Sequence, residues 1–233
     1  MKDAARRAWL RQLLASGALG AAGLSGLIQR AQAMAQRPVA QGIQELKGDV
    51  RINKVRAKAG DLVNPGDTVT TGAESSVIFV IGQDSVLLRE NSRLQIKGEI
   101  GTSDGVKTIT VRALNLLRGK MLSVFGKGEK RIISPTATIG IRGTGVYVEV
   151  EPQRTYVCTC YGETVLEAKG STARETIRTT HHEAPRYVYA NRAPEAAMTS
   201  APLINHTDDE LTMLEALLGR SPPFAGIEQH RRY

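Results

Sequence analysis

The feature that most constrains this chain is a succession of short β-branched segments, each ended by glycine or by an Asn or Asp turn, over residues 39–169. In residues 108–113, Thr-Ile-Thr-Val-Arg-Ala, apolar and polar side chains alternate, and helical spacing is not sustained anywhere in the region. This pattern predicts antiparallel strands with one buried and one wet face. We expect strands at residues 50–52, 68–71, 77–81, 86–88, 93–97, 108–114, 120–124, 146–150, 156–160 and 164–168.

Glycine and proline set the expected turns. Asn64-Pro65-Gly66-Asp67 is typical of a turn in which Pro fixes φ and Gly supplies a positive φ. Residues 82–85 are interpreted as a hairpin connection, and Gly119 and Gly162 as the ends of strands. The 23 glycines, with only three Phe and one Trp, indicate many turns around a core of Val, Ile, Leu and Thr. The predicted fold class is all-β, as a β-sandwich or β-roll.

Residues 1–35 have the pattern of an export signal. Arg6-Arg7 is followed by Trp9-Leu10 and then by a glycine-diluted apolar run to Gln29. Small-x-small cleavage sites end at Ala33 and Ala35. The paired arginines resemble a twin-arginine signal. We therefore expect a periplasmic protein cleaved near Ala33 or Ala35, with no membrane span after cleavage. The alternative is an uncleaved anchor, because about 18 mostly apolar residues nearly reach the span of a bilayer.

The charge of the chain does not indicate nucleic-acid binding. The formal net charge is +8, but residues 1–35 hold five basic residues and one acidic residue, so about half of it belongs to the signal. The remaining basic residues are interspersed with Asp and Glu and lack interleaved aromatics. We expect a protein partner of the periplasm or envelope and no nucleic acid.

The order of the motifs resembles the periplasmic FecR domain. Residues 65–72 (Pro-Gly-Asp-Thr-Val-Thr-Thr-Gly), Leu116-Leu117-Arg118-Gly119-Lys120 and residues 134–144 (Ser-Pro-Thr-Ala-Thr-Ile-Gly-Ile-Arg-Gly-Thr) follow the family's sequence of motifs. Pro135, Arg142, Gly143 and Thr144 belong to its most distinctive motif. The resemblance implies a FecR-like β-sandwich or β-roll at residues 39–170, in a regulator that relays a signal from an outer-membrane transporter to a sigma factor.

The front of the chain departs from that family layout. Only about a dozen residues precede the apolar run, too few to fold into a segment that holds a sigma factor. The sequence therefore predicts a FecR-like binding or regulatory module. A diverged signalling subunit that acts with an outer-membrane transporter is the alternative.

The family motif also has a reading from its residues alone. Gly140, Gly143 and Gly145 allow tight turns, and Arg142 between them can donate hydrogen bonds to carbonyls of neighbouring loops. We expect Arg142 and Thr144 to lock a corner of the fold.

Cys158-Thr159-Cys160 and His181-His182 are the one constellation that departs from a plain β domain. Cysteines two apart project from the same face of a strand, and a thiolate pair with an imidazole suits a transition metal or haem. Adjacent histidines on an extended chain point to opposite faces, so only His181 or His182 would join the site unless the two lie in a loop. The sequence leaves open that the cysteines are buried core or a strained redox pair.

No pattern of a hydrolase or phosphate-binding loop is present, so the chain is not expected to be an enzyme. Asp49, Asp67 and Asp84 fall at expected turns, where carboxylates cap backbone amides. A Cys-dependent redox activity at Cys158 and Cys160 is the alternative from the enzyme class.

The C-terminal part is expected to extend the β domain. Residues 171–206 hold a predicted hairpin, with strands at 174–179 and 186–190 and the two histidines between them. Thr207-Asp208-Asp209-Glu210 is a capping box that opens an amphipathic helix over residues 207–219, which Gly219 closes. The helix either packs on the β domain or docks a partner, and residues 220–233 form a flexible tail.

Overall fold

The computed structural model describes residues 40–103 and 106–225. The predicted export signal at residues 1–35, with Arg6, Arg7 and the cleavage sites at Ala33 and Ala35, lies outside the described residues. The predicted tail at 220–233 is described only as far as Ala225.

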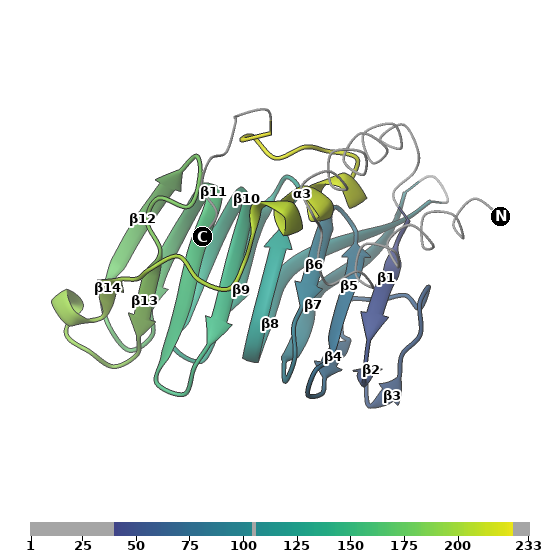
Figure 1. Cartoon of the computed structure of the whole chain (residues 1–233), viewed down its shortest axis with the longest axis horizontal. Coiled ribbons are helices and arrows are strands. Elements are labelled where there is room, and N and C mark those ends of the chain that lie inside the picture. The colour runs from purple at the N-terminus through teal and green to yellow at the C-terminus, as the bar shows by residue number, and fades with distance from the viewer. Residues whose placement is uncertain (1–39, 104–105, 226–233) are drawn as a thin grey trace.

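The described residues form a fourteen-stranded sheet followed by one short α-helix (Figure 1), which confirms the predicted all-β class with a C-terminal helix. The strands and helices are β1 (Gly42–Lys47), β2 (Val50–Ile52), β3 (Val55–Arg56), β4 (Thr68–Thr71), β5 (Ser76–Ile81), β6 (Asp84–Leu88), β7 (Arg93–Ser103), β8 (Val106–Val124), β9 (Glu129–Ile133), β10 (Ala137–Val150), β11 (Arg154–Ala168), β12 (Arg174–Thr179), β13 (Arg186–Tyr189), the 3-10 helix η1 (Pro194–Ala196), β14 (Met198–Ser200) and α3 (Asp208–Leu217).

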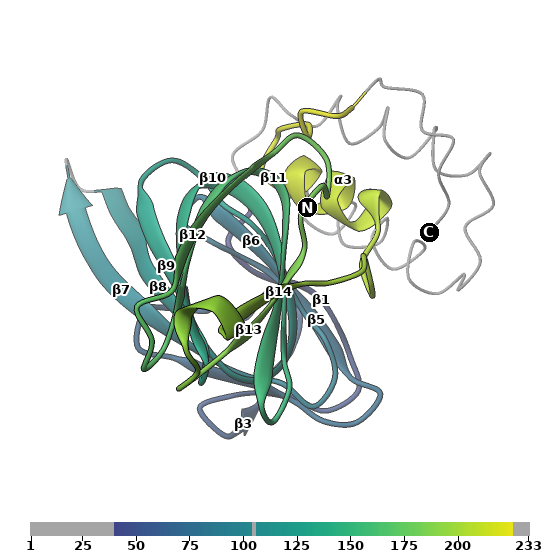
Figure 2. The ribbon, with the colours of Figure 1, turned by 90° about the vertical axis from the view of Figure 1, so that its left-hand side faces the viewer.

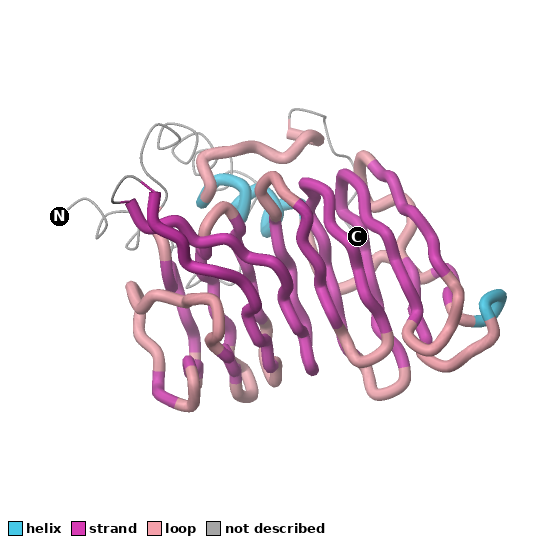
Figure 3. The backbone as a smooth tube through the Cα atoms, turned by 180° about the vertical axis from the view of Figure 1, so that it is seen from behind, coloured by secondary structure: helices cyan, strands magenta, loops and turns pink. Residues whose placement is uncertain are grey.

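Three long strands, β8, β10 and β11, belong to two layers at once. The first part of β8 pairs with β7 and its last part with β6. In the same way β10 pairs first with β9 and then with β8, while β11 pairs with β13 near its start and with β12 near its end. Figure 2 shows these strands bending from one layer to the other, and Figure 3 shows them from behind with loops at both ends. The main hydrophobic cluster fills the space between the layers.

Glycines mark the bends and do not end the strands, so the predicted strand ends at Gly119 and Gly162 were wrong. Both have φ of +90°, and β8 and β11 continue through them. Glycine inside a strand allows a sharp bend where two layers meet, because no side chain obstructs the approaching backbone. The family motif was likewise interpreted as turns, but residues 137–144 form the first half of β10.

The corner of the fold is built from Thr144 and the glycines around it. The register of β10 and β11 shifts between Arg142 and Val146. The hydroxyl of Thr144 donates a hydrogen bond to the carbonyl of Tyr161 across this shift. Thr144 therefore holds the corner as expected.

Arg142 does not hold the corner. Its side chain is 68% exposed and lies 3.8 Å from Glu163, so it does not donate to buried loop carbonyls as predicted. The reason is the position of Arg142 in a regular strand, on the face that points to water. Pro135 precedes β10 in the short connection from β9.

A second hydrophobic cluster covers the outer face of one layer. Side chains of β5 alternate between the two clusters, with Phe79 in the interior cluster and Ile78 and Val80 in the outer one. Strands buried on both faces read as continuous apolar runs, which accounts for the sequence Ser-Val-Ile-Phe-Val-Ile of β5. The outer cluster is covered by α3, which lies across β6 and β8 (Figure 1).

The helix α3 begins as predicted. The Thr207 hydroxyl accepts from the Glu210 amide, and the Glu210 carboxylate accepts from the Thr207 amide. Leu211, Leu214 and Leu217 are buried against the sheet. The helix therefore packs on the β domain, and among the described residues no helix has the length and apolarity needed to cross a membrane.

Gly145 provides a test of the corner. A Cβ at this position would lie 2.6 Å from the Tyr161 ring and 3.1 Å from Leu211. We expect Gly145→Ala to lower the free energy of unfolding by about 1–3 kcal/mol, because overpacking displaces both neighbours. Gly140→Ala in the same strand is the control, since its Cβ would meet Val165 at an ordinary 3.6 Å. Urea unfolding of both variants measures the difference, and equal stabilities would contradict the packing argument.

Candidate metal centre

Cys158 and Cys160 lie on β11 and point to the outer face of the sheet, under the C-terminal segment. Tyr156, Cys158 and Cys160 alternate along the strand and join the outer cluster. The register shifts at Cys160, between the pairs Gly145 with Tyr161 and Val146 with Thr159. Both thiols are free and fully buried. The strand therefore presents two sulfur atoms in one apolar place, as the spacing predicted.

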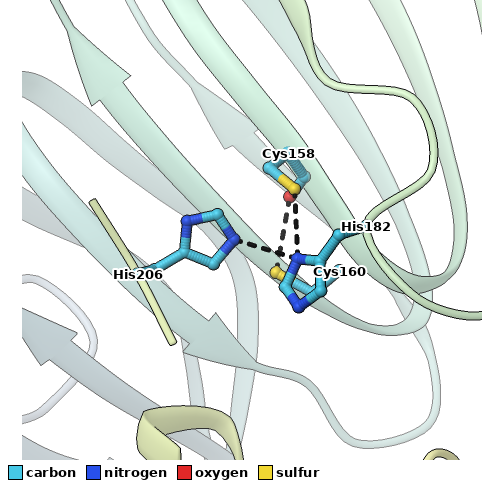
Figure 4. A group of neighbouring side chains, drawn as sticks. All are labelled: Cys158, Cys160, His182 and His206. Carbon is cyan, nitrogen blue, oxygen red and sulfur yellow. Dashed lines mark hydrogen bonds between the residues drawn. The ribbon is translucent and has the colours of Figure 1, made fainter. Parts of the chain in front are cut away.

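Two histidines complete this group (Figure 4). His182 lies in the connection between β12 and β13, and His206 lies in the segment between β14 and α3. Nδ1 of His182 is 3.4 Å from Sγ of Cys158 and 3.1 Å from Nε2 of His206. The donor atoms of the four residues all lie within 4.8 Å of one another, and all four residues are buried.

The outward nitrogens of both histidines are engaged by acceptors. Nδ1 of His206 lies 2.7 Å from the carbonyl of Ile204, so this nitrogen carries the proton and donates. Nε2 of His182 donates in the same way to Asp208 at 2.9 Å. Nε2 of His206 therefore presents a lone pair to Nδ1 of His182, which lies 3.1 Å from it and 3.4 Å from Sγ of Cys158. Either a proton on Nδ1 of His182 or a metal ion among these atoms satisfies that lone pair.

Two of the distances between donor atoms are close to those of a tetrahedral shell. With Zn–S near 2.3 Å and Zn–N near 2.0–2.1 Å, tetrahedral geometry places sulfur and nitrogen ligands about 3.5 Å apart and two nitrogens about 3.3 Å apart. The observed separations are 3.4 Å and 3.1 Å. The donor set is also chemically suited, since two thiolates and two imidazoles form a common structural zinc site.

The local electrostatics already favour a positive charge at this point. Burial opposes the Cys158 thiolate, but hydrogen bonds from Cys160, His182 and His206 outweigh it and hold its pKa well below the usual value. Burial likewise opposes a charged His182, yet the contacts with Asp208 and Cys158 raise its pKa to about 9. A proton is thus held between Cys158 and His182, in the position that a metal ion would take by releasing it.

The pKa of Cys160 moves the other way. Burial and the adjacent Cys158 hold the pKa of the Cys160 thiol well above its usual value. One thiolate and one thiol therefore share the cluster.

His181 is not among the four donors. Its Nε2 lies 3.0 Å from both carboxylate oxygens of Asp208, so it contacts the residue that orients His182. Of the two histidines that the sequence offered, the structure brings His182 to the cysteines. Its backbone has a φ of +53°, and the rings of His181 and His182 lie edge to face with centroids 4.8 Å apart, both in contact with Asp208.

His206 and Asp208 were missed in the sequence. His206 stands alone, 24 residues after His182, with no spacing that associates it with the cysteines. Its ring stacks on Tyr147 with centroids 4.6 Å apart, which fixes its plane. Asp208 was assigned only to the helix cap. The available signal was the position of His206 directly before that cap, in a segment that had to pack somewhere.

Haem fits these residues poorly. A haem takes its protein ligands on the axis of a flat ring, whereas these four donors converge on one point within 4.8 Å. The arrangement corresponds to one small ion.

The comparisons with known proteins give one family match and two structural neighbours. Residues 67–164 match the family model described as FecR protein. Two solved structures, each described as a "putative anti-sigma factor" from Parabacteroides distasonis, share 10% identity with this chain at TM-scores of 0.44 and 0.45. The alignments cover 57% of this chain and 58% of the first structure, and 64% of both chains for the second. The chain thus spans less than two thirds of either. No curated protein matches it significantly.

Proposed function

We propose that this chain is an exported FecR-like regulatory module of the bacterial envelope that binds one transition-metal ion, of the coordination class of zinc, through Cys158, Cys160, His182 and His206. The observation that carries the proposal is the convergence of four buried donor atoms within 4.8 Å of one another, with Nδ1 of His182 3.1 Å from Nε2 of His206 and 3.4 Å from Sγ of Cys158. A metal ion that displaced the proton of His182 would be met by all four donors.

The outer contacts support a metal role further. In metal sites a ligating histidine donates its other N–H to a carboxylate or a backbone carbonyl, which fixes the ring and raises its basicity. His182 has the carboxylate of Asp208 and His206 has the carbonyl of Ile204. Both kinds of outer partner are therefore in place around this cluster.

The export signal is consistent with this use. Two free thiols in an oxidising compartment need protection by burial or by a metal. A twin-arginine substrate folds before export, so the ion can be bound while the cysteines are reduced. The regulatory part of the proposal is supported by the family match at residues 67–164, and the expected partner is an envelope protein.

A thiol redox protein is the second candidate, because Cys158, His182 and Asp208 form a chain of contacts like that of a nucleophile, a base and an orienting acid. The Cys158 side chain is fully buried, however, and a partner thiol cannot reach it without moving the segment that carries His206. The metal role is therefore preferred.

The deciding experiment is the metal content of the full chain purified from a bacterial periplasm. Native mass spectrometry is expected to show one zinc per chain, and replacement by Co²⁺ should give the thiolate charge-transfer and tetrahedral d–d bands of a sulfur-nitrogen site. Both cysteines should become alkylatable only after chelation and unfolding. A protein that takes up neither metal would overturn the proposal, and a Cys158–Cys160 disulfide in that protein would favour the redox candidate.

A further inference from the structure

We propose that the metal ion docks the C-terminal segment, residues 201–225, onto the sheet, so that its binding controls whether the outer hydrophobic cluster is covered. This inference rests on the metal site proposed above and assigns that site a regulatory consequence. The term C-terminal segment denotes residues 201–225 from this point.

The four donors come from the sheet, from a connection between two of its strands and from the C-terminal segment. Cys158 and Cys160 belong to β11, which is hydrogen-bonded on both sides, and His182 lies in the connection that follows β12. His206 is the one donor from the C-terminal segment, which begins after β14 and adds no strand to the sheet. An ion shared by these residues therefore joins the segment to the sheet.

A second link between the segment and the site runs through Asp208, which contacts the ring of His182. Asp208 lies in the first turn of α3, and its carboxylate accepts from His182 at 2.9 Å. The ring of His182 thus lies between the proposed ion and the helix. The segment is joined to the site twice, directly by His206 and indirectly by Asp208, and both links lie at the start of α3.

Other contacts also hold the C-terminal segment on the sheet. An isolated helix of ten residues is marginal in water, so α3 depends on its contacts with the sheet. Polar contacts lie at several points along the segment, among them Arg89 with Glu210 at 2.7 Å and the Ser85 hydroxyl, which donates to the Leu214 carbonyl at 2.9 Å. Apolar side chains of the segment supply the rest of the interface. A metal ligand would add to these contacts at the start of α3, where His206 lies.

The C-terminal segment covers an apolar face of the sheet. Ile78, Val80, Leu122 and Val124 of the sheet belong to the outer cluster with the leucines of α3. Releasing the segment would expose this apolar face together with the cysteines. The state of the ion would therefore change the surface that the module presents.

The test is hydrogen exchange of the full chain, with and without zinc, read at the amides of α3. The undocked form lacks His206 as a ligand and therefore binds zinc more weakly than the docked form. With free zinc at about 100 times its Kd, amide exchange in α3 is expected to slow on the order of 10- to 100-fold. Amides of β5 serve as the internal reference and should change far less. His206→Gln should retain weaker zinc binding by the other three donors and lose most of the slowing.

The outcomes separate this inference from the proposed function. One equivalent of zinc with unchanged exchange in α3 would overturn the docking role and leave the metal site standing. No zinc uptake would overturn both. The double variant Leu211→Ala/Leu214→Ala gives the reciprocal check, since neither leucine offers a donor atom. Linkage requires that weaker docking of α3 lowers the zinc affinity, and we expect a loss of at least about tenfold. An unchanged affinity in a variant with fast α3 exchange would also contradict the docking role.

Discussion

Replacing Cys158 with serine is expected to weaken zinc binding on the order of 100- to 1,000-fold. Four-ligand structural sites bind zinc with about 10–16 kcal/mol, so each ligand contributes about 2.5–4 kcal/mol on average. Serine keeps the size of the side chain but offers a hydroxyl that stays protonated and coordinates zinc poorly. Competition with a chromogenic chelator of known affinity measures the change in Kd.

Three further variants make the result specific. Cys160→Ser and His182→Asn should give losses of the same order, because each removes one donor. His181→Asn should give a smaller loss, since His181 is not among the four donors and meets the site through Asp208. Thr159→Ser is the control, because Thr159 lies between the two cysteines and is also buried. Its hydroxyl forms a hydrogen bond of 2.6 Å with the hydroxyl of Thr164, away from the site. Equal losses for His181→Asn and His182→Asn would contradict the assignment of the donor.

Replacing Asp84 with alanine is expected to lower the free energy of unfolding by about 3–5 kcal/mol, because it leaves the charge of Lys130 buried without a partner. Nζ of Lys130 lies 2.5 Å from Oδ1 of Asp84, and the two side chains are 7% and 1% exposed. The same oxygen accepts from the Gly126 amide at 2.9 Å, so the pair also fixes the connection between β8 and β9. Urea unfolding monitored by circular dichroism measures the loss.

The pair itself is not a net source of stability. Burial raises the pKa of Asp84 by more than Lys130 and Gly126 lower it, so holding the charge in this place is costly. A double variant, Asp84→Leu/Lys130→Met, removes both charges and should recover most of the stability that Asp84→Ala loses. A single variant within about 1 kcal/mol of the natural protein would show that Lys130 reaches water, and the account of the pair would then be wrong.

The strand pattern could be predicted where alternation and turns agree. The segments at 50–52, 68–71 and 174–179 match β2, β4 and β12 residue for residue, and the capping box placed the start of α3. The prediction divided long strands at glycines, because a glycine is compatible both with a bend inside a strand and with the end of a strand. Which of the two applies depends on a partner strand from elsewhere in the chain, as for β10 and β11 at Gly162. β1 and β9 lack the β-branched runs that marked the other strands.

The candidate site shows the same division between local and distant information. Two cysteines on one strand face follow from the period of a strand alone. Asp84 was expected to cap a backbone amide, which it does at Gly126, but it also begins β6 and pairs with Lys130, 46 residues away. His206 depends on the path of the C-terminal segment across the outer face, which no local pattern specifies. Arg142 was overvalued because its family motif suggested a buried role, while its place in β10 exposes it.

The three strands shared by both layers have a mechanical consequence. Because β8, β10 and β11 run through the corner without a break, neither layer can swing or slide against the other without rupturing the backbone ladders of both. The β body should therefore melt in one cooperative step and offers no hinge between its halves. Any signal that this molecule transmits by a change of shape must then originate in parts that are not woven into the ladders.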